Sequence, residues 1–273
     1  MKRAAVILAG GAGTRLYPLS SEDNPKQFLR VFSGRSLLEM TWNRLSRIVP
    51  PEAIFVSTNE RYRAKCLEHL PQMPPANVLT EPARRNTAPA IALCTATIAR
   101  RYSDQTAVAF LPSDAFIGDE PEFSRILDKA YDFAESRDYL VTVAIHATSP
   151  HTGFGYVELG DAIVPGVIHL RRFTEKPSRE VAEEFLRAGN YAWNSGIFVW
   201  RGEVFAQALR AASPELADVS MENYETMPST SIDYALMEKA PNVATVPGEF
   251  GWSDVGSFQA LRAAGAEIPD DLP

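Results

Sequence analysis

The sequence predicts an α/β protein whose Rossmann-like, mostly parallel sheet is flanked by helices, and three observations lead to this class. Apolar runs of strand length alternate with helical patterns through the first half of the 273 residues, the order expected of a sheet with helices on both faces. The first apolar run leads directly into a glycine-rich turn. From about residue 151 the strands become shorter, which indicates a subdomain packed on the same sheet.

The first half accounts for the parallel part of the expected sheet. Ligands of such sheets bind beyond the carboxyl ends of the strands. The segments 10–15, 81–87 and 113–114 follow three of these strands, so we expect them to be the binding loops. The expected strands are residues 4–9, 54–58, 77–80, 107–111 and 140–145, and the expected helices are residues 37–48, 61–70, 88–101 and 122–136.

The second half continues the same domain. No Gly- and Ser-rich linker, repeat or low-complexity tract separates the two halves. We therefore expect one domain over 1–273, with halves at 1–150 and 151–265 and a polar tail at 266–273. The expected strands of the second half are residues 155–159, 167–174 and 194–200, and the expected helices are residues 179–186, 204–211, 231–239 and 257–264.

Composition excludes several classes of protein. The net charge of −7 argues against a surface that coats a polyanion, so no nucleic-acid partner is expected. No apolar run approaches the ~18 residues that a membrane span needs, and the short N-terminal run is interpreted as a core strand instead of a signal peptide. Cys66 and Cys94 lie within expected helices without metal-type spacing, which fits buried thiols in a reducing compartment. These features predict a cytoplasmic protein without a membrane partner.

The loop after the first strand has the residues of a polyphosphate-binding site. Glycines allow backbone N–H groups to approach an anion closely, and Arg15 and Lys26 add positive charge beside Gly10, Gly11 and Gly13. A Walker A loop would need Gly-Lys-Ser/Thr, and the dinucleotide fingerprint would need a third small residue where Leu16 stands. The loop is therefore neither of these two common types.

Five segments in order along the chain resemble one enzyme family. LAGGAGTRLYPLS with PKQFL, EP followed by RNTAPAI, FTEKP, WNSGIF and WSDVGS run from residue 8 to residue 257. They are similar to the sugar-nucleotide pyrophosphorylases, and within these to the mannose-1-phosphate guanylyltransferase branch. The resemblance implies a nucleotide-diphospho-sugar transferase fold with a sugar-binding subdomain. It also implies that the substrates GTP and mannose 1-phosphate give GDP-mannose and pyrophosphate.

The chemistry of nucleotidyl transfer suggests roles for the charged residues in these segments. Two polyanions must meet, so cations and Mg²⁺ are the main requirement; Arg15 and Lys26 are the expected catalytic cations. Mg²⁺ binds through one or two carboxylates and substrate phosphates. Asp114, which follows an expected strand, and Asp254 suit this role, and the resemblance places both at the metal.

Substrate-binding residues are expected on both sides of these aspartates. Glu81 follows a strand, and its two acceptor oxygens match the adjacent N1–H and N2–H₂ donors of guanine. The resemblance implies that Glu175 binds sugar hydroxyls and Lys176 the sugar phosphate. The expected nucleotide-binding residues are Gly10, Gly11, Ala12, Gly13, Thr14, Glu81, Arg85, Asn86, Thr87 and Pro89, and the expected sugar-phosphate-binding residues are Gly155, Glu175, Lys176 and Asn194.

Two alternatives to this prediction stay open. One is the same reaction with another base or sugar, such as a glucose-1-phosphate thymidylyl- or uridylyltransferase. The other is a non-catalytic subunit that binds a sugar nucleotide and regulates a partner, although retention of the predicted metal and phosphate groups argues against it. The sequence does not distinguish a monomer from a homodimer.

Overall fold

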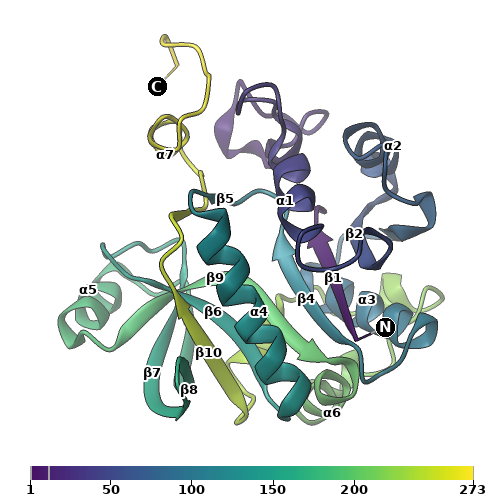
Figure 1. Ribbon diagram of the computed structural model, residues 1–273, viewed down its shortest axis with the longest axis vertical. Coiled ribbons are helices and arrows are strands. Elements are labelled where there is room, and N and C mark those ends of the chain that lie inside the picture. The colour runs from purple at the N-terminus through teal and green to yellow at the C-terminus, as the bar shows by residue number, and fades with distance from the viewer. Residues whose placement is uncertain (1, 12, 273) are drawn as a thin grey trace.

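The computed structural model describes residues 2–11 and 13–272, which fold around a nine-stranded sheet in the order β3-β2-β1-β4-β9-β6-β10-β8-β7 (Figure 1). A separate two-stranded sheet joins β5 (Phe116–Ile117) to β11 (Trp252–Ser253). The strands of the large sheet are β1 (Arg3–Leu8), β2 (Ile54–Asn59), β3 (Val78–Glu81), β4 (Ala107–Pro112), β6 (Leu140–His146), β7 (Gly155–Val164), β8 (Val167–Glu175), β9 (Tyr191–Arg201) and β10 (Val243–Gly248).

The predicted α/β class is confirmed, but the sheet is mixed instead of mostly parallel. β1 runs parallel to β2 and β4, and the pairs β2–β3 and β6–β10 are also parallel. β9 is antiparallel to β4, β6 and β7, and β8 is antiparallel to β7 and β10. One reason is the short Pro165-Gly166 turn between β7 and β8, since a connection of this length can join only antiparallel neighbours.

Helices cover both faces of the sheet. Alternate residues of β1 point to opposite faces. Ala5 and Ile7 pack in one core with residues of α1 (Leu37–Leu45), α2 (Glu60–His69), α4 (Glu120–Ser136) and α5 (Arg179–Ala188). Ala4 and Val6 pack in the other core with α3 (Thr87–Arg101) and α6 (Gly202–Ala212). A smaller third core joins α7 (Phe258–Ala263) to the segment around Phe32 and Leu37.

Local capping explains where several of these helices begin. Ser36 and Glu39 form a reciprocal capping box at the start of α1, which satisfies backbone donors that a helix leaves unpaired. Asp119, Ser178 and Ser257 accept hydrogen bonds from the first turns of α4, α5 and α7 in the same way. These helices therefore start within about two residues of the sequence-based expectation.

Several elements differ from the expectation, including β5 and β11, which were not predicted. Residues 231–239 contain a π-helical turn, Asp233–Met237, in place of an α-helix. β10 was not among the expected strands, and it contains Pro247, a residue that is disfavoured inside a sheet. β10 pairs with β8 only at Ala244 and Thr245, so Pro247 lies beyond that pairing.

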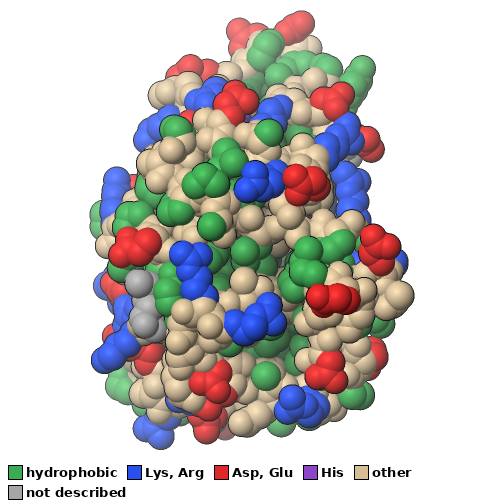
Figure 2. Space-filling view, turned by 90° about the vertical axis from the view of Figure 1, so that its right-hand side faces the viewer, with side chains coloured by type: hydrophobic (Ala, Val, Ile, Leu, Met, Phe, Trp, Pro, Cys, Tyr) green, Lys and Arg blue, Asp and Glu red, His purple; other side chains and the backbone are tan. Residues whose placement is uncertain are grey.

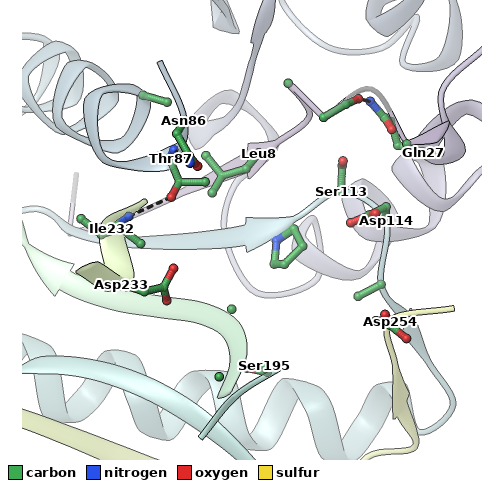
Figure 3. A pocket seen from close by; sticks show the side chains of 18 of the residues that line it. Leu8, Gln27, Asn86, Thr87, Ser113, Asp114, Ser195, Ile232, Asp233 and Asp254 are labelled. Atoms are coloured by element: carbon green, nitrogen blue, oxygen red, sulfur yellow. Dashed lines mark hydrogen bonds between the residues drawn. The ribbon is translucent and has the colours of Figure 1, made fainter. Parts of the chain in front are cut away.

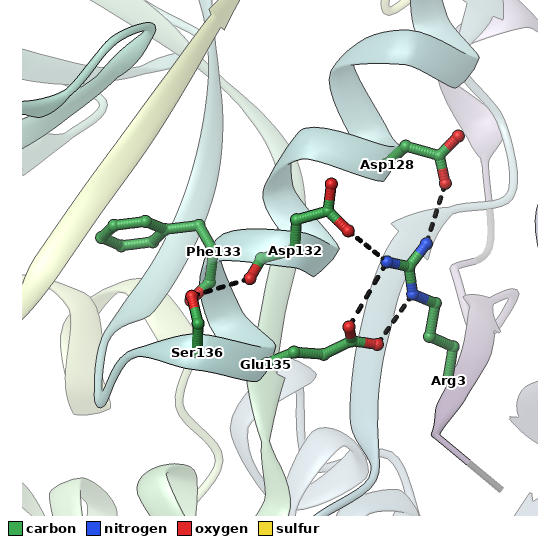
Figure 4. Close-up of polar contacts among 6 residues, drawn as sticks. All are labelled: Arg3, Asp128, Asp132, Phe133, Glu135 and Ser136. Atoms are coloured by element: carbon green, nitrogen blue, oxygen red, sulfur yellow. Dashed lines mark hydrogen bonds and ion pairs between the residues drawn. The ribbon is translucent and has the colours of Figure 1, made fainter.

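A charged clamp joins the first strand to the longest helix. The guanidinium of Arg3 on β1 contacts three carboxylates of α4, at 2.9 Å to Asp128, 2.5 Å to Asp132 and 2.8 Å to Glu135 (Figure 4). Its Cζ atom also lies 4.9 Å from the centre of the Tyr131 ring. The clamp joins α4 to the N-terminal end of β1, and the glycine loop follows the other end of this strand.

Acidic and basic side chains are interspersed over the face shown in Figure 2, without a large patch of one sign. None of the helices in the described part of the chain is long and apolar enough to cross a membrane.

Candidate active site

A cleft of about 770 Å³ opens over the carboxyl ends of β1 and β4 (Figure 3). Its walls come from the glycine loop, the start of α3, the loop after β4, the ends of β7 and β8, the middle of β9 and the loop after β10. The predicted site residues that line it are Gly10, Gly11, Gly13, Arg15, Lys26, Glu81, Asn86, Thr87, Asp114, Gly155, Glu175, Lys176, Asn194 and Asp254.

The other predicted nucleotide-binding residues have different positions. Ala12 lies outside the described residues, and Thr14 begins a short 3₁₀ turn that ends at Leu16. Arg85 is not among the lining residues, because its guanidinium donates to the backbone carbonyl of Glu225. Pro89 is buried in the first turn of α3. Arg85 and Pro89 therefore support the wall of the cleft without lining it.

The glycine loop is held in place by its own geometry and by Gln27. Gly13 has a φ of +56°, and a Cβ atom there would lie 2.6 Å from the backbone nitrogen of Lys26. The amide of Gln27 donates to the carbonyls of Ala9 and Gly11 at 3.1 and 3.0 Å. Gln27 was not predicted as a site residue, although it follows Lys26 directly in the PKQFL segment.

Lys26 brings together the two aspartates that were predicted to bind metal. Its Nζ lies 3.0 Å from Oδ2 of Asp114 and donates to the backbone carbonyl of Asp254. The lysine side chain is only 8% exposed, whereas that of Asp114 is 40% exposed. A buried ammonium group therefore sits between residues that are 140 positions apart in the chain, while the carboxylate of Asp114 reaches the cleft.

The backbone after Asp254 has an unusual conformation. Val255 has a φ of +38°, which a β-branched residue rarely adopts. Side chains stabilise the turn: Ser253 Oγ accepts from Val255 N at 3.0 Å, and Asp254 Oδ1 accepts from Gly256 N at 3.2 Å. Strain of this kind persists where the surrounding structure over-determines it and is concentrated at functional sites. Here the hydrogen bond from the N–H of Gly256 holds the direction of the Asp254 carboxylate.

The donor set at this end of the cleft fits Mg²⁺. The described residues contain no group of three or more His, Cys, Asp or Glu side chains placed to hold a metal ion, but Mg²⁺ needs only one or two carboxylates when phosphates complete its shell. Asp114 Oδ1 and Asp254 Oδ2 have no hydrogen-bond partner among the described residues, and Figure 3 shows both carboxylates at the same end of the cavity. These two oxygens are therefore free to bind a cation.

The same cleft is also lined by the residues predicted to bind a sugar phosphate. Glu175 is 8% exposed and forms an ion pair with Lys176. A Cβ atom at Gly155 would lie 2.5 Å from Glu175 Oε2, so only glycine leaves room for this carboxylate. Lys176 has a φ of +47°, and its N–H donates to the carbonyl of Phe154 at 3.2 Å. The backbone thus turns sharply to present Glu175 and Lys176 side by side.

Glu81, predicted to bind the nucleotide, has a carboxylate that two hydroxyl groups orient. Its Oε2 accepts from the hydroxyl of Tyr224 at 2.7 Å, and its Oε1 lies 3.4 Å from the hydroxyl of Ser57. Burial raises the pKa of Glu81, although both hydrogen bonds oppose that rise. Tyr224 comes from a segment 143 positions away, so sequence spacing alone contained no signal for this contact.

Asp233 is a lining residue that the sequence analysis did not single out. It begins the π-helical turn, and its carboxylate points into the cavity (Figure 3). Burial, together with the nearby charge of Glu175, raises the pKa of Asp233 to about 7. An aspartate within an expected amphipathic helix is ordinarily a solvated residue, so the sequence held no sign of this position.

Comparison with known proteins places the chain in a family. The family model described as Nucleotidyl transferase matches residues 4–271. The chain belongs to this nucleotidyl transferase family. Over 94% of its length it is 40% identical to the xanthan biosynthesis protein XanB of Xanthomonas campestris pv. campestris, and 36% identical to mannose-1-phosphate guanylyltransferase 2 of Escherichia coli O157:H7. This nucleotidyl transferase chain spans 58% of the length of each of these relatives.

A solved structure supports the same assignment. A Thermus thermophilus protein described as a mannose-1-phosphate geranyltransferase superposes with a TM-score of 0.89 at 35% identity. The alignment covers 99% of this chain and 81% of that one. The fold seen here is therefore the fold of this nucleotidyl transferase family.

Proposed function

We propose that this chain catalyses the reaction of GTP with mannose 1-phosphate to give GDP-mannose and pyrophosphate. The observation that carries the proposal is the arrangement of the cleft. Arg15 and Lys26 lie with Asp114 and Asp254, and Glu175 and its neighbours line the same cavity. The names of two relatives, XanB and mannose-1-phosphate guanylyltransferase 2, agree with a role in handling mannose phosphates or polysaccharide precursors.

The reaction needs one bond to form and one to break at the α-phosphorus of the nucleotide. An oxygen of the sugar phosphate attacks this phosphorus, and the bond to the bridging oxygen of the β-phosphate breaks, so pyrophosphate leaves with the electron pair. The protein holds the two reactants in line and balances the charge that develops on the leaving group. Arg15 and the glycine-loop N–H groups bind the triphosphate, and Lys176 binds the sugar phosphate.

The carboxylates of Asp114 and Asp254 would hold Mg²⁺. When bound, the ion neutralises phosphate oxygens and favours departure of pyrophosphate. Lys26 keeps both aspartates in place through its contacts with the Asp114 carboxylate and the Asp254 carbonyl. Lys26 therefore serves as a fixed internal cation next to the metal position.

We assign selection of guanine to Glu81. An ionised carboxylate accepts from N1–H and N2–H₂ of guanine together, whereas adenine has an acceptor at N1 and no amino group at C2. With adenine the carboxylate keeps its contacts with Tyr224 and Ser57 but faces the base without a donor. Hydrogen bonds left unmade at a buried group cost ~1–3 kcal/mol, so GTP should be preferred over ATP by at least roughly 10- to 100-fold. Glu81→Gln should reduce the preference for GTP over ITP, which lacks the 2-amino group. An unchanged ratio would move base selection to the backbone of residues 85–89.

One crossed experiment separates this proposal from its alternatives. Pyrophosphate release is measured with each of four nucleoside triphosphates against mannose 1-phosphate and glucose 1-phosphate. Highest kcat/KM with GTP and mannose 1-phosphate supports the proposal. A different best pair would indicate a pyrophosphorylase of another base or sugar. No release with any pair, in a chain that still binds a sugar nucleotide, would indicate a non-catalytic regulatory subunit.

A further inference from the structure

The sugar end of the cleft contains a second acidic side chain besides Glu175. Asp233 enters the cavity from the π-helical turn that follows the 213–232 segment, whereas Glu175 enters from the end of β8. The two carboxylates are close enough for the charge of Glu175 to disfavour ionisation of Asp233. Two acids that share a half-enclosed site are stabilised by a ligand with several hydrogen-bond donors.

Asn194 connects Asp233 to the expected sugar site. The backbone N–H of Gly196 donates to Asn194 Oδ1 at 3.3 Å, so this atom is the acceptor of the amide. The hydroxyl of Thr142, 2.8 Å away, also contacts Oδ1. The amide nitrogen Nδ2 is thereby turned toward Asp233 Oδ1, at 3.4 Å. One of its two hydrogens remains for a ligand in the cleft.

The carboxylate of Asp233 forms no ion pair with any residue that the structure describes, because the ammonium group of Lys176 is paired with Glu175. The charged form of Asp233 is favoured by hydrogen bonds from its own backbone and the Ser231 hydroxyl and, more weakly, by the charge of Lys176. π-Helical turns occur often at functional sites, and this one is tied to the nucleotide side of the cleft, because the N–H of Ile232 donates to Thr87 Oγ1 at 2.9 Å (Figure 3).

We propose that Asp233 is a specificity-determining residue for the sugar: its carboxylate accepts a hydrogen bond from a hydroxyl of the hexose ring, and Asn194 donates to the same ring. The inference deepens the proposed function and rests on it, because it assigns the ligand of Asp233 as the hexose of a sugar 1-phosphate. A hydroxyl suits the position because it donates to the carboxylate and accepts from the amide.

The experiment compares single-deoxy analogues of mannose 1-phosphate with wild-type protein and with Asp233→Asn. Loss of a hydrogen bond to a charged group costs ~1.5–3 kcal/mol, or roughly 10- to 100-fold in affinity. Asp233→Asn should therefore raise KM for mannose 1-phosphate by ~10-fold or more and leave KM for GTP within ~2-fold. One deoxy analogue should bind weakly to wild type but lose little further affinity in the variant, because the bond is already absent.

Asp218→Asn is the matched control, since Asp218 is an exposed acid on the same chain segment. It should leave both KM values unchanged. Equal KM for mannose 1-phosphate in Asp233→Asn and wild type would overturn the inference. The inference would also be overturned if every deoxy analogue lost as much affinity in the variant as in wild type, so that the two effects simply add. If Asp233→Asn does not fold, Asp233→Glu is tested with the same analogues, and the same additivity would overturn the inference.

Failure of the proposed function is a separate result. If wild type prefers another sugar 1-phosphate, the proposed substrate is wrong, and the inference is then judged by the KM of the variant for that sugar. If wild type releases no pyrophosphate, calorimetric titration of mannose 1-phosphate replaces turnover. Equal affinity of wild type and variant, or no binding by wild type, overturns the inference.

Discussion

Lys26 is the residue through which distant parts of the chain meet in the cleft. Its backbone packs against Gly13, and its ammonium group contacts both Asp114 and Asp254. A cation this deeply buried needs acceptors to offset its lost hydration. The pair of aspartates supplies them and retains two carboxylate oxygens for a metal ion. At the scale of single residues, the positive charge of Lys26 is therefore offset by the acceptors of Asp114 and Asp254 inside the cleft.

Removing the charge of either aspartate tests the metal proposal. Asp114→Asn and Asp254→Asn should each lower kcat by roughly 10²-fold or more, on the scale of losing one preorganised electrostatic group. Circular dichroism should show an unchanged fold, and Asp161→Asn, at an exposed position, should remain active. Full activity of Asp254→Asn, or full turnover in excess chelator, would contradict the assignment.

The stability of the protein should depend on pH through Asp233. Burial and the charge of Glu175 raise its folded-state pKa to about 7 from an ordinary value of 3.8. Folding thus favours the protonated form, so its contribution is complete below pH 3.8 and is lost as pH rises toward 7. The groups that face Asp233 are Glu175 and Lys176 from the end of β8, Asn194 from β9 and Ser231 from its own turn.

Asp233→Asn removes the charge that must be buried at neutral pH. Relative to wild type, the variant should therefore gain free energy of unfolding as pH rises from about 4 to about 8. Urea denaturation at a series of pH values measures this difference, and effects of other acids such as Glu81 cancel in the comparison. A difference that is constant with pH, or that falls as pH rises, would contradict the raised pKa.

At the scale of elements, the functional groups lie on loops that rigid strands position. β1, β2 and β4 are in register at Leu8, Ser57 and Pro112, so their following loops start at one edge of the sheet. The glycine loop then has no freedom to move toward Lys26, because Gly13 already lies against its backbone. The conformation of the loop is therefore set by close packing as well as by glycine flexibility.

Gly13→Ala tests this packing. The added methyl group would meet the Lys26 backbone at 2.6 Å in a residue with positive φ, so the loop must shift. We expect turnover to fall ~10-fold or more, because misplacing phosphate-binding groups is costly to catalysis. Gly34→Ala is the matched control: its φ is +73°, but nothing lies within 4 Å of the new methyl group. Equal losses in the two variants would show that backbone strain alone is responsible.

At the scale of the whole molecule, one sheet joins the two predicted halves. β9 comes from the second half but pairs with β4 of the first, and β6 pairs with both β9 and β10. The cleft is lined by residues from both halves of the chain. Their relative positions therefore depend on the packing of the sheet and the helices that cover it. The contact of Arg3 with α4 is one of the links that hold this arrangement.

Arg3→Ala should destabilise the protein without changing the site. It leaves three carboxylates on α4 without their shared cation. The expected loss in free energy of unfolding is about 1–2 kcal/mol, because the carboxylates are partly exposed and screened by solvent. Arg125→Ala removes an exposed pair with Glu122 and should have a much smaller effect, as is usual for surface pairs. Denaturation in low and high salt measures both, and equal losses would contradict a special role for the clamp.

Much of the fold could be predicted from local patterns. The strand–helix alternation of the first half and the capping residues Ser36, Asp119 and Ser178 act over a few residues, so they can be recognised in the sequence. β10 and the π-helical turn could not, because both depend on neighbours far along the chain. Pro247 lies beyond the pairing of β10 with β8, which ends at Thr245, and its partner in the sheet is Ala144 of β6.

The same distinction holds for the candidate site. By itself the sequence determined the glycine loop, its cations and, through resemblance, the residues on both sides of the cleft, since each lies in a short recognisable segment. Only the tertiary structure decided that Tyr224 orients Glu81, that Lys26 lies between Asp114 and Asp254, and that Asp233 enters the same cavity as Glu175. The reason is physical: hydrogen bonding, charge and burial act through space, and these partners are separated by 39 to 228 positions in the chain.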